Sequence, residues 1–394
     1  MARPIILTLL PHYLPGFKAG GPIRTVSNMV DLLSDRFDFR IVTSDRDYGD
    51  AEPFPGIAPD TWIDTGRERR YYADAAHRTL RSFARRITEV GPDVVYLNSL
   101  FDATFSIAPL LARRLGMVGA GPAWVIAPRG ECSRGAMALK APKKRLFLGL
   151  ARLLGLHRGL TWQASSVHEA EDIRRELGVD AGSIVVAPNP TESAGAFVAP
   201  ESVGTEPPPL EICFLSRVSP KKNLAFALEA LAAVRVPVRF HVYGPVEDGE
   251  YAAECRRIEA RCPPHVGVTW HGEVAHENVR PTIARHHLFL FPTGGENFGH
   301  VIFEALAAGV PVLVSDRTPW RDLDEQGIGW VRTLDDPSVF ADVIDRYAAV
   351  PRAERERIAA RAHAYARSVA CSPAVLDANQ GLFERAISAR VRRG

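Results

Sequence analysis

The chain of 394 residues is predicted to be an α/β protein made of two doubly wound, Rossmann-like domains. It is longer than one ordinary hydrophobic core requires, and 46% of its residues are apolar, so two domains of about 200 residues each are expected. Short apolar runs alternate with longer helical patterns, which is typical of β-α-β units around a parallel sheet. Prolines interrupt this alternation between residues 191 and 210, after which it restarts. The boundaries predict an N-terminal domain at 1–190, a linker at 191–210 and a C-terminal domain at 211–372.

The individual elements follow from the same alternation. In the first domain, strands are expected at 5–10, 39–43, 94–97, 124–127, 161–164 and 184–186, and helices at 25–33, 79–89, 105–115, 143–154 and 167–177. In the second, strands are expected at 212–215, 240–243, 268–270, 288–291 and 312–315, and helices at 224–234, 252–261, 301–308 and 338–348. The last segment, 373–394, is a helical pattern with no strand after it. It is expected either to stay with the second domain or to cross back onto the first.

Composition excludes several classes of function. The net charge is +2 with a pI near 8.3, so no overall basic field indicates a nucleic-acid partner. The apolar run at 4–10 is too short for a signal peptide or a membrane span and fits a first buried strand. The cysteines form neither a Cys-x-x-Cys motif nor a paired pattern, which fits a reducing compartment and predicts a cytoplasmic protein. They are Cys132, Cys213, Cys255, Cys262 and Cys371.

The segment 294–305 carries the strongest functional signal. It follows a buried strand, and its glycines precede a helix that is expected to begin near Phe298 or Gly299. The first amides of a helix have no intrahelical partners and would stabilise a phosphate. Glu296 in the loop and Glu304 inside the helix flank that position, and carboxylates accept hydrogen bonds from sugar hydroxyls. These features predict a nucleotide-sugar site. The alternative is that Glu296 caps the helix and Glu304 forms a surface ion pair.

A pair of basic residues follows the first strand of the second domain. Arg217 and Lys222 lie five positions apart across a predicted strand-to-helix turn, so both can converge on one phosphate group. The alternative is that they are solvated charges at a helix N-terminus, where cations oppose the helix dipole unless an anion is present.

These two segments resemble the retaining glycosyltransferases of family 4, the group 1 glycosyltransferases of GT-B fold. Glu296 and Glu304, eight positions apart, match the family's signature, and Arg217 and Lys222 match its basic pair. The resemblance implies two Rossmann-like domains that face each other across a cleft. It also implies front-face transfer of a sugar from a nucleotide-diphosphate donor to an acceptor hydroxyl, with Glu296, Arg217 and Lys222 catalytic. No cofactor or metal ion is expected, because the basic residues supply the positive charge.

The same resemblance implies the remaining site residues. The expected donor-binding residues are Gly20, Gly21, Arg217, Lys222, Glu273, Val274, Asn297, Phe298, Gly299, His300 and Glu304. Many relatives have His-Gly after the fourth strand, whereas this chain has Arg129-Gly130, so a histidine role does not carry over. The acceptor side is expected to involve Asn98 and Arg129.

The segment 134–158 is basic and amphipathic, with no acidic residue. It is expected either to rest on anionic lipid or to be an ordinary helix whose apolar stripe packs on the sheet. The first alternative places the protein at the inner face of the cell membrane. A saccharide or lipid-linked saccharide of envelope polysaccharide or glycoconjugate synthesis is then the expected acceptor.

Two other functions fit the same residues. A sugar-nucleotide epimerase on this scaffold would make similar contacts to a nucleotide. A catalytically inactive nucleotide-binding assembly partner would retain the donor site without turnover.

Overall fold

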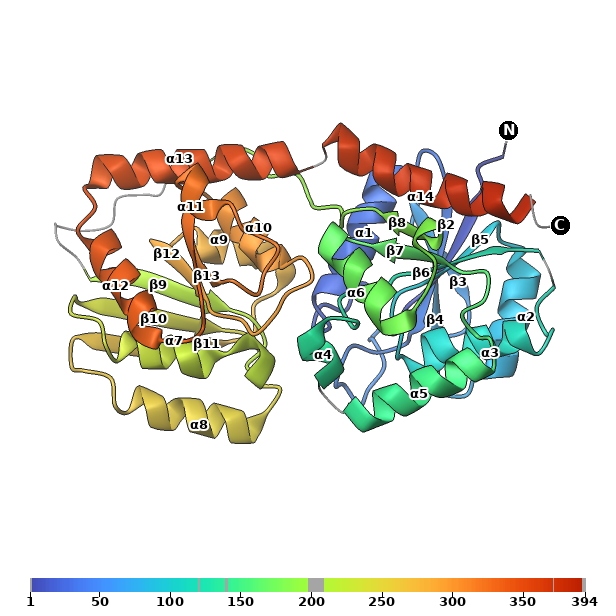
Figure 1. The fold of residues 1–394 in the computed structure, drawn as a ribbon, viewed down its shortest axis with the longest axis horizontal. Helices are drawn as coiled ribbons and strands as arrows, with labels where there is room; N and C mark the ends of the chain where they lie inside the picture. The colour runs from blue at the N-terminus through green and yellow to red at the C-terminus, as the bar shows by residue number, and fades with distance from the viewer. Residues whose placement is uncertain (1, 120, 139–140, 198–208, 371, 392–394) are drawn as a thin grey trace. The chain divides into compact units, whose positions relative to one another are not determined.

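The computed structural model describes residues 2–119, 121–138, 141–197, 209–370 and 372–391. Its contacts divide the chain into two compact units, drawn in Figure 1. Unit 1 consists of Met1–Thr191 and Cys371–Gly394, and unit 2 consists of Glu192–Ala370. The C-terminal segment 373–394 therefore belongs with the first unit. Part of the predicted linker, residues 198–208, lies outside the described residues.

Unit 1 contains an eight-stranded sheet. Its spatial order is β3 (Trp62–Asp64), β4 (Glu68–Ala73), β2 (Asp38–Ser44), β1 (Ile5–Leu9), β5 (Val94–Leu97), β6 (Ala123–Ile126), β7 (Thr161–Ala164) and β8 (Ile184–Val186). Neighbouring strands are parallel except for the antiparallel pair β3 and β4. The chain leaves β1 towards β2 on one side and later returns to β5 on the other. In folds with such a reversal, ligands bind at the carboxyl ends of the two strands where it occurs, which here are β1 and β5.

Helices cover both faces of this sheet. They are α1 (Gly21–Leu33), α2 (Leu80–Val90), η1 (Ala103–Ile107), α3 (Ala108–Arg114), α4 (Arg134–Ala138), α5 (Ala141–Leu153), α6 (Val167–Leu177), η2 (Ala181–Ser183) and α14 (Pro373–Val391). Side chains of β1 alternate between the two cores, with Leu7 in one and Ile6 in the other. Helix α14 packs on the Ile6 face, where the ring of Phe383 contacts Phe37 and Tyr96 at centroid distances of 5.4 Å. The apolar face of α14 explains why the last helix belongs to unit 1.

Unit 2 contains a six-stranded parallel sheet. Its order is β11 (Val266–Gly272), β10 (Val238–Tyr243), β9 (Leu210–Leu215), β12 (Leu288–Phe291), β13 (Val312–Ser315) and β14 (Gly329–Arg332). Its helices are η3 (Pro220–Lys222), α7 (Leu224–Leu231), α8 (Gly249–Glu259), η4 (His276–Asn278), α9 (Val279–Ile283), α10 (His300–Ala307), α11 (Leu323–Gln326), α12 (Pro337–Ala348) and α13 (Arg352–Val369). The strand order reverses between β9 and β12. The loops after these two strands therefore meet at the carboxyl edge of the sheet.

The predicted class, two parallel-sheet α/β domains, is confirmed, and every expected strand is present. Sequence reasoning missed β3, β4, β14 and α13, together with the short helices α9 and α11. Strand β4 contains adjacent arginines, so it lacks a continuous apolar run, although Tyr71 and Tyr72 are buried. Helix α13 buries a narrow stripe of mostly small side chains, including Ala359 and Ala362, on an otherwise charged surface.

Candidate active site

The loops at the carboxyl edge of the unit 2 sheet bring Lys222 and Glu296 into direct contact. Lys222 ends η3, which follows β9, and Glu296 lies in the loop after β12. Lys222 Nζ lies 2.5 Å from Glu296 Oε1, and the two side chains are only 14% and 12% exposed. Thr293 Oγ1 donates a second hydrogen bond to the same carboxylate oxygen at 3.1 Å. Two residues predicted to be catalytic, 74 positions apart, thus form one partly buried pair.

The loop that carries Glu296 is held by backbone hydrogen bonds. Gly294 N donates to Lys221 O at 2.8 Å, and Glu296 N donates to Arg317 O at 3.0 Å. The first of these bonds ties the loop to the turn that carries Lys222. Helix α10 then begins at His300, with Gly299 as its N-cap, which agrees with the predicted start.

Gly299 gives the turn before α10 a conformation that other residues rarely adopt. Its φ is +79°, and a Cβ there would lie 2.9 Å from Ile302 Cδ1. Trp320 Nε1 donates to Phe298 O at 2.6 Å, and the rings of Phe298 and His300 lie 4.8 Å apart. Asn297, in the same turn, is half-buried. The predicted donor-binding residues 297–300 therefore form one ordered turn at the N-terminus of α10.

Arg217 forms an ion pair with a different carboxylate from the one that Lys222 contacts. Its Nη1 lies 2.8 Å from Oε1 of Glu247, a residue of the loop after β10. The expectation that both cations converge on one group therefore concerns a ligand, not a contact within the protein. Sequence reasoning missed Glu247, because no local motif marks the loop after β10 as part of a site.

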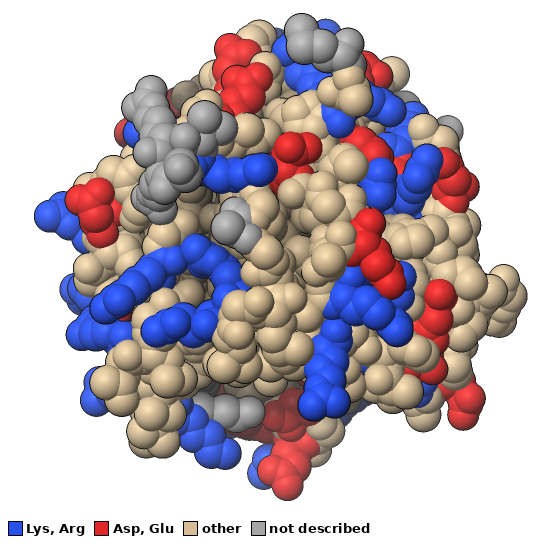
Figure 2. Space-filling view, turned by 90° about the vertical axis from the view of Figure 1, so that its right-hand side faces the viewer, with Lys and Arg blue, Asp and Glu red and all other residues tan. Residues whose placement is uncertain are grey.

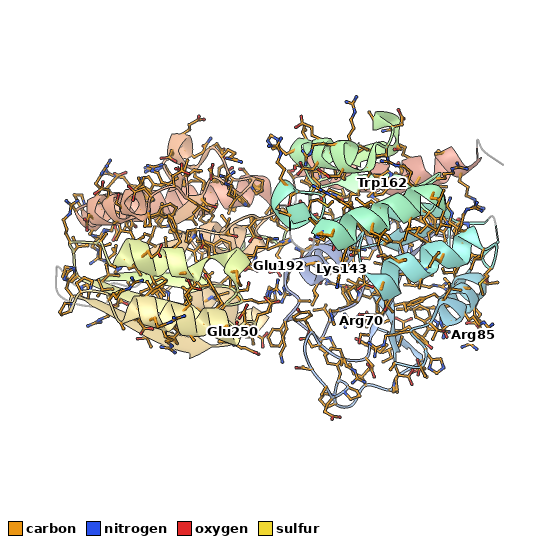
Figure 3. The ribbon with its side chains drawn as sticks, turned by 60° about the horizontal axis from the view of Figure 1, so that its bottom comes forward. Arg70, Arg85, Lys143, Trp162, Glu192 and Glu250 are labelled. Atoms are coloured by element: carbon orange, nitrogen blue, oxygen red, sulfur yellow. The ribbon has the colours of Figure 1, made fainter. Side chains whose placement is uncertain are left out.

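Glu304 is buried in the second turn of α10, which excludes the alternative of a surface ion pair. His276 Nδ1 lies 3.9 Å from Glu304 Oε1, while the Nε2 atom of the same ring lies 2.6 Å from Glu192 Oε1. Figure 3 labels Glu192, the first residue of unit 2. The predicted Glu273 and Val274 follow β11, the edge strand, where Glu273 is exposed and Val274 is half-buried.

The glycine loop of unit 1 follows β1. Gly20, with φ +73°, is the N-cap of α1, and Gly21 is the first residue of that helix. The buried Asp47 anchors the loop, because its Oδ2 accepts hydrogen bonds from Phe17 N at 2.8 Å and Lys18 N at 3.1 Å. No local signal in the sequence links Asp47 to this loop, which is about 30 residues earlier in the chain.

The two residues predicted for the acceptor side also meet. Asn98 follows β5 and Arg129 follows β6, and Arg129 Nη2 donates to Asn98 Oδ1 at 2.7 Å. Arg129 Nη1 donates to Oδ1 of Asn189, which follows β8, at 2.6 Å. The guanidinium also donates to the hydroxyl of Tyr96, whose complete burial raises its pKa. The tyrosine therefore stays neutral and keeps its proton for hydrogen bonding.

The buried carboxylate of Glu131 holds the loop that follows Asn98. It accepts from Ser99 Oγ at 2.9 Å and from Leu100 N at 2.5 Å. Burial raises the pKa of Glu131, while these donors act in the opposite direction. Glu131 thus organises the end of β5 from the neighbouring loop.

Potential metal ligands lie elsewhere in the described chain. Asp60, Asp74 and His77 of unit 1 are the one such group among the described residues, and none belongs to the predicted donor site.

Burial lowers the pKa of His12, another histidine of unit 1, so its imidazole is neutral at pH 7.

Two domain families match the sequence. Residues 20–190 match the family described as Glycosyl transferase 4-like domain, and residues 209–349 match the family described as Glycosyl transferases group 1. Together they include the predicted site residues of both units. No curated protein matches the chain.

Solved structures share the fold over nearly the whole chain. HepE from Anabaena, in complex with UDP and glucose, is 18% identical, with a TM-score of 0.70 over 97% of this chain and 99% of HepE. Sucrose-phosphate synthase from Thermosynechococcus elongatus is 17% identical, with a TM-score of 0.66 over 100% of this chain and 98% of the synthase. WaaG, a glycosyltransferase involved in lipopolysaccharide biosynthesis, is 15% identical, with a TM-score of 0.63 over 98% of each chain.

Proposed function

The chain belongs to the group 1 glycosyltransferases and has their GT-B fold, and from this premise we propose the following reaction. The protein is a retaining, metal-independent transferase of family 4. It moves a sugar, a hexose in our proposal, from a nucleoside-diphosphate sugar to a hydroxyl of a saccharide or lipid-linked saccharide. HepE, which has the same fold, has been solved with UDP and with UDP-glucose, which is the donor class proposed here.

The contact between Lys222 and Glu296 carries this proposal. A partly buried ammonium held on the loop that precedes α10 provides positive charge for a diphosphate, and the helix amides add to it. The adjacent carboxylate of Glu296 accepts hydrogen bonds from hydroxyls of the transferred sugar. Glu304, one turn further into the helix, is proposed to bind the ribose. Donor-site residues 297–300 complete the phosphate-binding turn.

The proposed reaction is a front-face substitution. The acceptor oxygen forms a bond to the anomeric carbon on the face from which the diphosphate oxygen departs, and that oxygen takes the hydroxyl proton. The negative charge that develops on the diphosphate is stabilised by Lys222, Arg217 and the start of α10. These groups supply the positive charge that a divalent cation supplies in other transferases.

This reaction predicts a specific response to nucleotide-sugars. The purified chain should be stabilised against thermal unfolding by one donor of a panel and should slowly release the nucleoside diphosphate from it. Release should be unchanged by EDTA, because the proposed site uses protein charges instead of a metal ion. A free epimeric nucleotide-sugar as the product would indicate an epimerase. Binding without release would indicate an inactive assembly partner, and neither binding nor release would refute the donor site.

We further propose that α5 rests on the inner face of an anionic membrane, where a lipid-linked acceptor would be available. Its inner side packs through Leu148 and Ala151, so the packing alternative accounts for one face. The other face exposes a row of leucines, of which Leu153 is 81% exposed. Leucines at this spacing form one helical stripe, and basic side chains flank it. The exposed leucine and basic residues of α5 and of the segment that follows it are Lys143, Arg145, Leu146, Leu150, Arg152, Leu153, Leu154 and Arg158.

The figures show how charge is distributed on this unit. Lys143 is labelled in Figure 3 near the beginning of α5. Figure 2 views the molecule from the side of unit 1, where one group of Lys and Arg side chains lies on the left and others lie at the upper right and lower centre, among acidic side chains. Helices able to cross a bilayer are absent from the residues that the structure describes. The attachment that we propose, through the exposed leucines and basic residues of α5, is to a membrane surface.

Changing two exposed leucines of α5 should weaken vesicle binding. The double variant Leu150→Asp/Leu153→Asp is expected to lower co-sedimentation with phosphatidylglycerol-containing vesicles by roughly tenfold or more, because each leucine contributes about 1.5–3 kcal/mol when fully buried in an apolar phase. Val167→Asp, at an exposed apolar position of α6, is the matched control and should bind like the wild type. Equal binding of all three proteins would rule out the α5 surface.

A further inference from the structure

Asn98 has a buried amide nitrogen that the protein does not satisfy. The residue is only 3% exposed, and its Nδ2 is shielded from solvent without a hydrogen-bond partner among the described residues. A buried donor without a partner costs about 1–3 kcal/mol, so native proteins rarely retain one without a reason. A ligand that accepts a hydrogen bond from this nitrogen provides such a reason.

Arg129 fixes the orientation of the Asn98 amide. Its Nε and Nη2 donate to Asn98 Oδ1 at 3.1 and 2.7 Å. A guanidinium has donors only, so the amide oxygen must face it and the nitrogen must point away. Turning the amide over would place N–H groups against N–H groups and lose both bonds.

The guanidinium is itself held from several sides. Nη1 donates to Asn189 Oδ1 at 2.6 Å, and Nη2 donates to the hydroxyl of Tyr96 at 2.5 Å. That hydroxyl in turn donates to Gln163 Oε1. All three guanidinium nitrogens therefore donate hydrogen bonds to protein partners. Arg129 is thus better placed to orient Asn98 than to bind a substrate.

The backbone at Arg129 supports this assignment. Its φ is +55°, a left-handed conformation that costs a side-chain-bearing residue roughly 1–2 kcal/mol. Such strain persists where the surroundings hold the residue in place. Here the conformation accompanies a guanidinium anchored between the loops that follow β5, β6 and β8.

Asn98 lies where the fold of unit 1 places ligands. Its backbone N donates to Leu9 O at 3.3 Å, so it stands beside the end of β1. The strand order of the sheet reverses between β1 and β5, and ligands occupy the crevice at such a reversal.

We propose that Asn98 contacts the substrate by donating from Nδ2 to a hydroxyl oxygen of a sugar ring, and that Arg129 is the positioning residue that orients it. The proposal rests on the function proposed above. The ring can belong to the transferred sugar or to the acceptor. Both present the same acceptor atom, a hydroxyl oxygen.

Asn98→Asp tests the contact with little change in shape. The carboxylate keeps an oxygen towards Arg129 and replaces the Nδ2 donor by a second acceptor. We expect a loss of about 10–100-fold in the step that uses the hydroxyl, with thermal unfolding confirming that the variant is folded. The measurements are calorimetric affinities for the nucleotide-sugar and the nucleoside diphosphate, the rate of diphosphate release in water, and transfer to a panel of octyl glycosides.

The measurements distinguish the two sources of the hydroxyl. Weaker binding of the nucleotide-sugar with unchanged binding of the diphosphate would assign the contact to the transferred sugar. Unchanged donor binding and unchanged release in water, with slower transfer to the glycoside, would assign it to the acceptor. Slower release when water is the acceptor would assign it to the transferred sugar, because no acceptor sugar is then present. Wild-type values in every measurement would overturn the contact. Failure of the wild type to release diphosphate from any donor would overturn the proposed function itself, before any variant is compared.

Arg129→Lys tests the positioning role. One ammonium cannot hold the amide oxygen with two donors, so the same step should slow, and the double variant Asn98→Asp/Arg129→Lys should be no slower than the worse single variant. Losses that multiply in the double variant would show that Arg129 acts independently of Asn98 and would overturn the positioning role.

Discussion

Lys222→Met is expected to lower sugar transfer by about three orders of magnitude. The variant removes the ammonium that lies 2.5 Å from Glu296 and beside the start of α10. Loss of that charge leaves the departing diphosphate with the helix amides and Arg217 alone. The measurement is the rate of nucleoside diphosphate release at saturating donor.

A structural role of Lys222 must be separated from a catalytic one. Lys222→Met leaves the carboxylate of Glu296 buried without its cation, so the melting temperature should also fall. Lys222→Met/Glu296→Gln removes both charges and is expected to recover the melting temperature but not the activity. Recovery of both would show that the pair only stabilises the fold.

The neighbouring lysine provides the matched control. Lys221 is exposed, and the contact that ties it to the donor loop comes from its backbone carbonyl, which accepts from Gly294 N at 2.8 Å. Lys221→Met leaves that carbonyl in place and is expected to retain nearly wild-type activity. An equal loss in both variants would indicate that total positive charge matters, not its position.

Gly244→Ala is expected to destabilise the protein by roughly 3 kcal/mol or more in urea unfolding. Gly244 follows β10 with φ +128°, and a Cβ there would lie 2.0 Å from Ser216 O, a contact that requires the backbone to move. Ser216 immediately precedes Arg217, so the same displacement should disturb the turn that carries Arg217 and Lys222. Surviving folded protein should therefore also bind the nucleotide-sugar more weakly.

Gly272→Ala separates two causes of destabilisation: the steric clash of an added Cβ and the strain of a left-handed backbone conformation. Gly272 ends β11 with φ +79°, and an added Cβ there would meet nothing within 4 Å. Its replacement should cost only about 1 kcal/mol, the penalty for a side chain in the left-handed region. Equal destabilisation by the two variants would mean that the Ser216 contact does not govern the effect.

The sequence alone predicted the class of fold and most of its helices and strands. The strands at 94–97, 161–164 and 288–291 coincide with the observed ones, because buried parallel strands are short continuous apolar runs. Strand β4 was missed because its adjacent arginines interrupt the apolar run that predicts a buried strand, and only part of its surface is buried. Helix α13 was missed because its buried stripe consists mostly of small residues.

The sequence also supplied the residues of the candidate site, since the glycine turn, the helix start and the charged residues are local patterns. Their partners were not predictable. The pairs of Lys222 with Glu296 and of Arg217 with Glu247 span 74 and 30 positions. Asn98 meets Arg129 across 31 positions.

Only the order of the strands decided which of these side chains meet. Local periodicity predicts that a segment is a strand, but it carries no information about the strand beside it. Once β9 lies next to β12, and β5 lies next to β1 and β6, the loops at their carboxyl ends are neighbours whatever their separation in the chain. The chemistry of each residue was therefore determined by the sequence, and its partners by the tertiary structure.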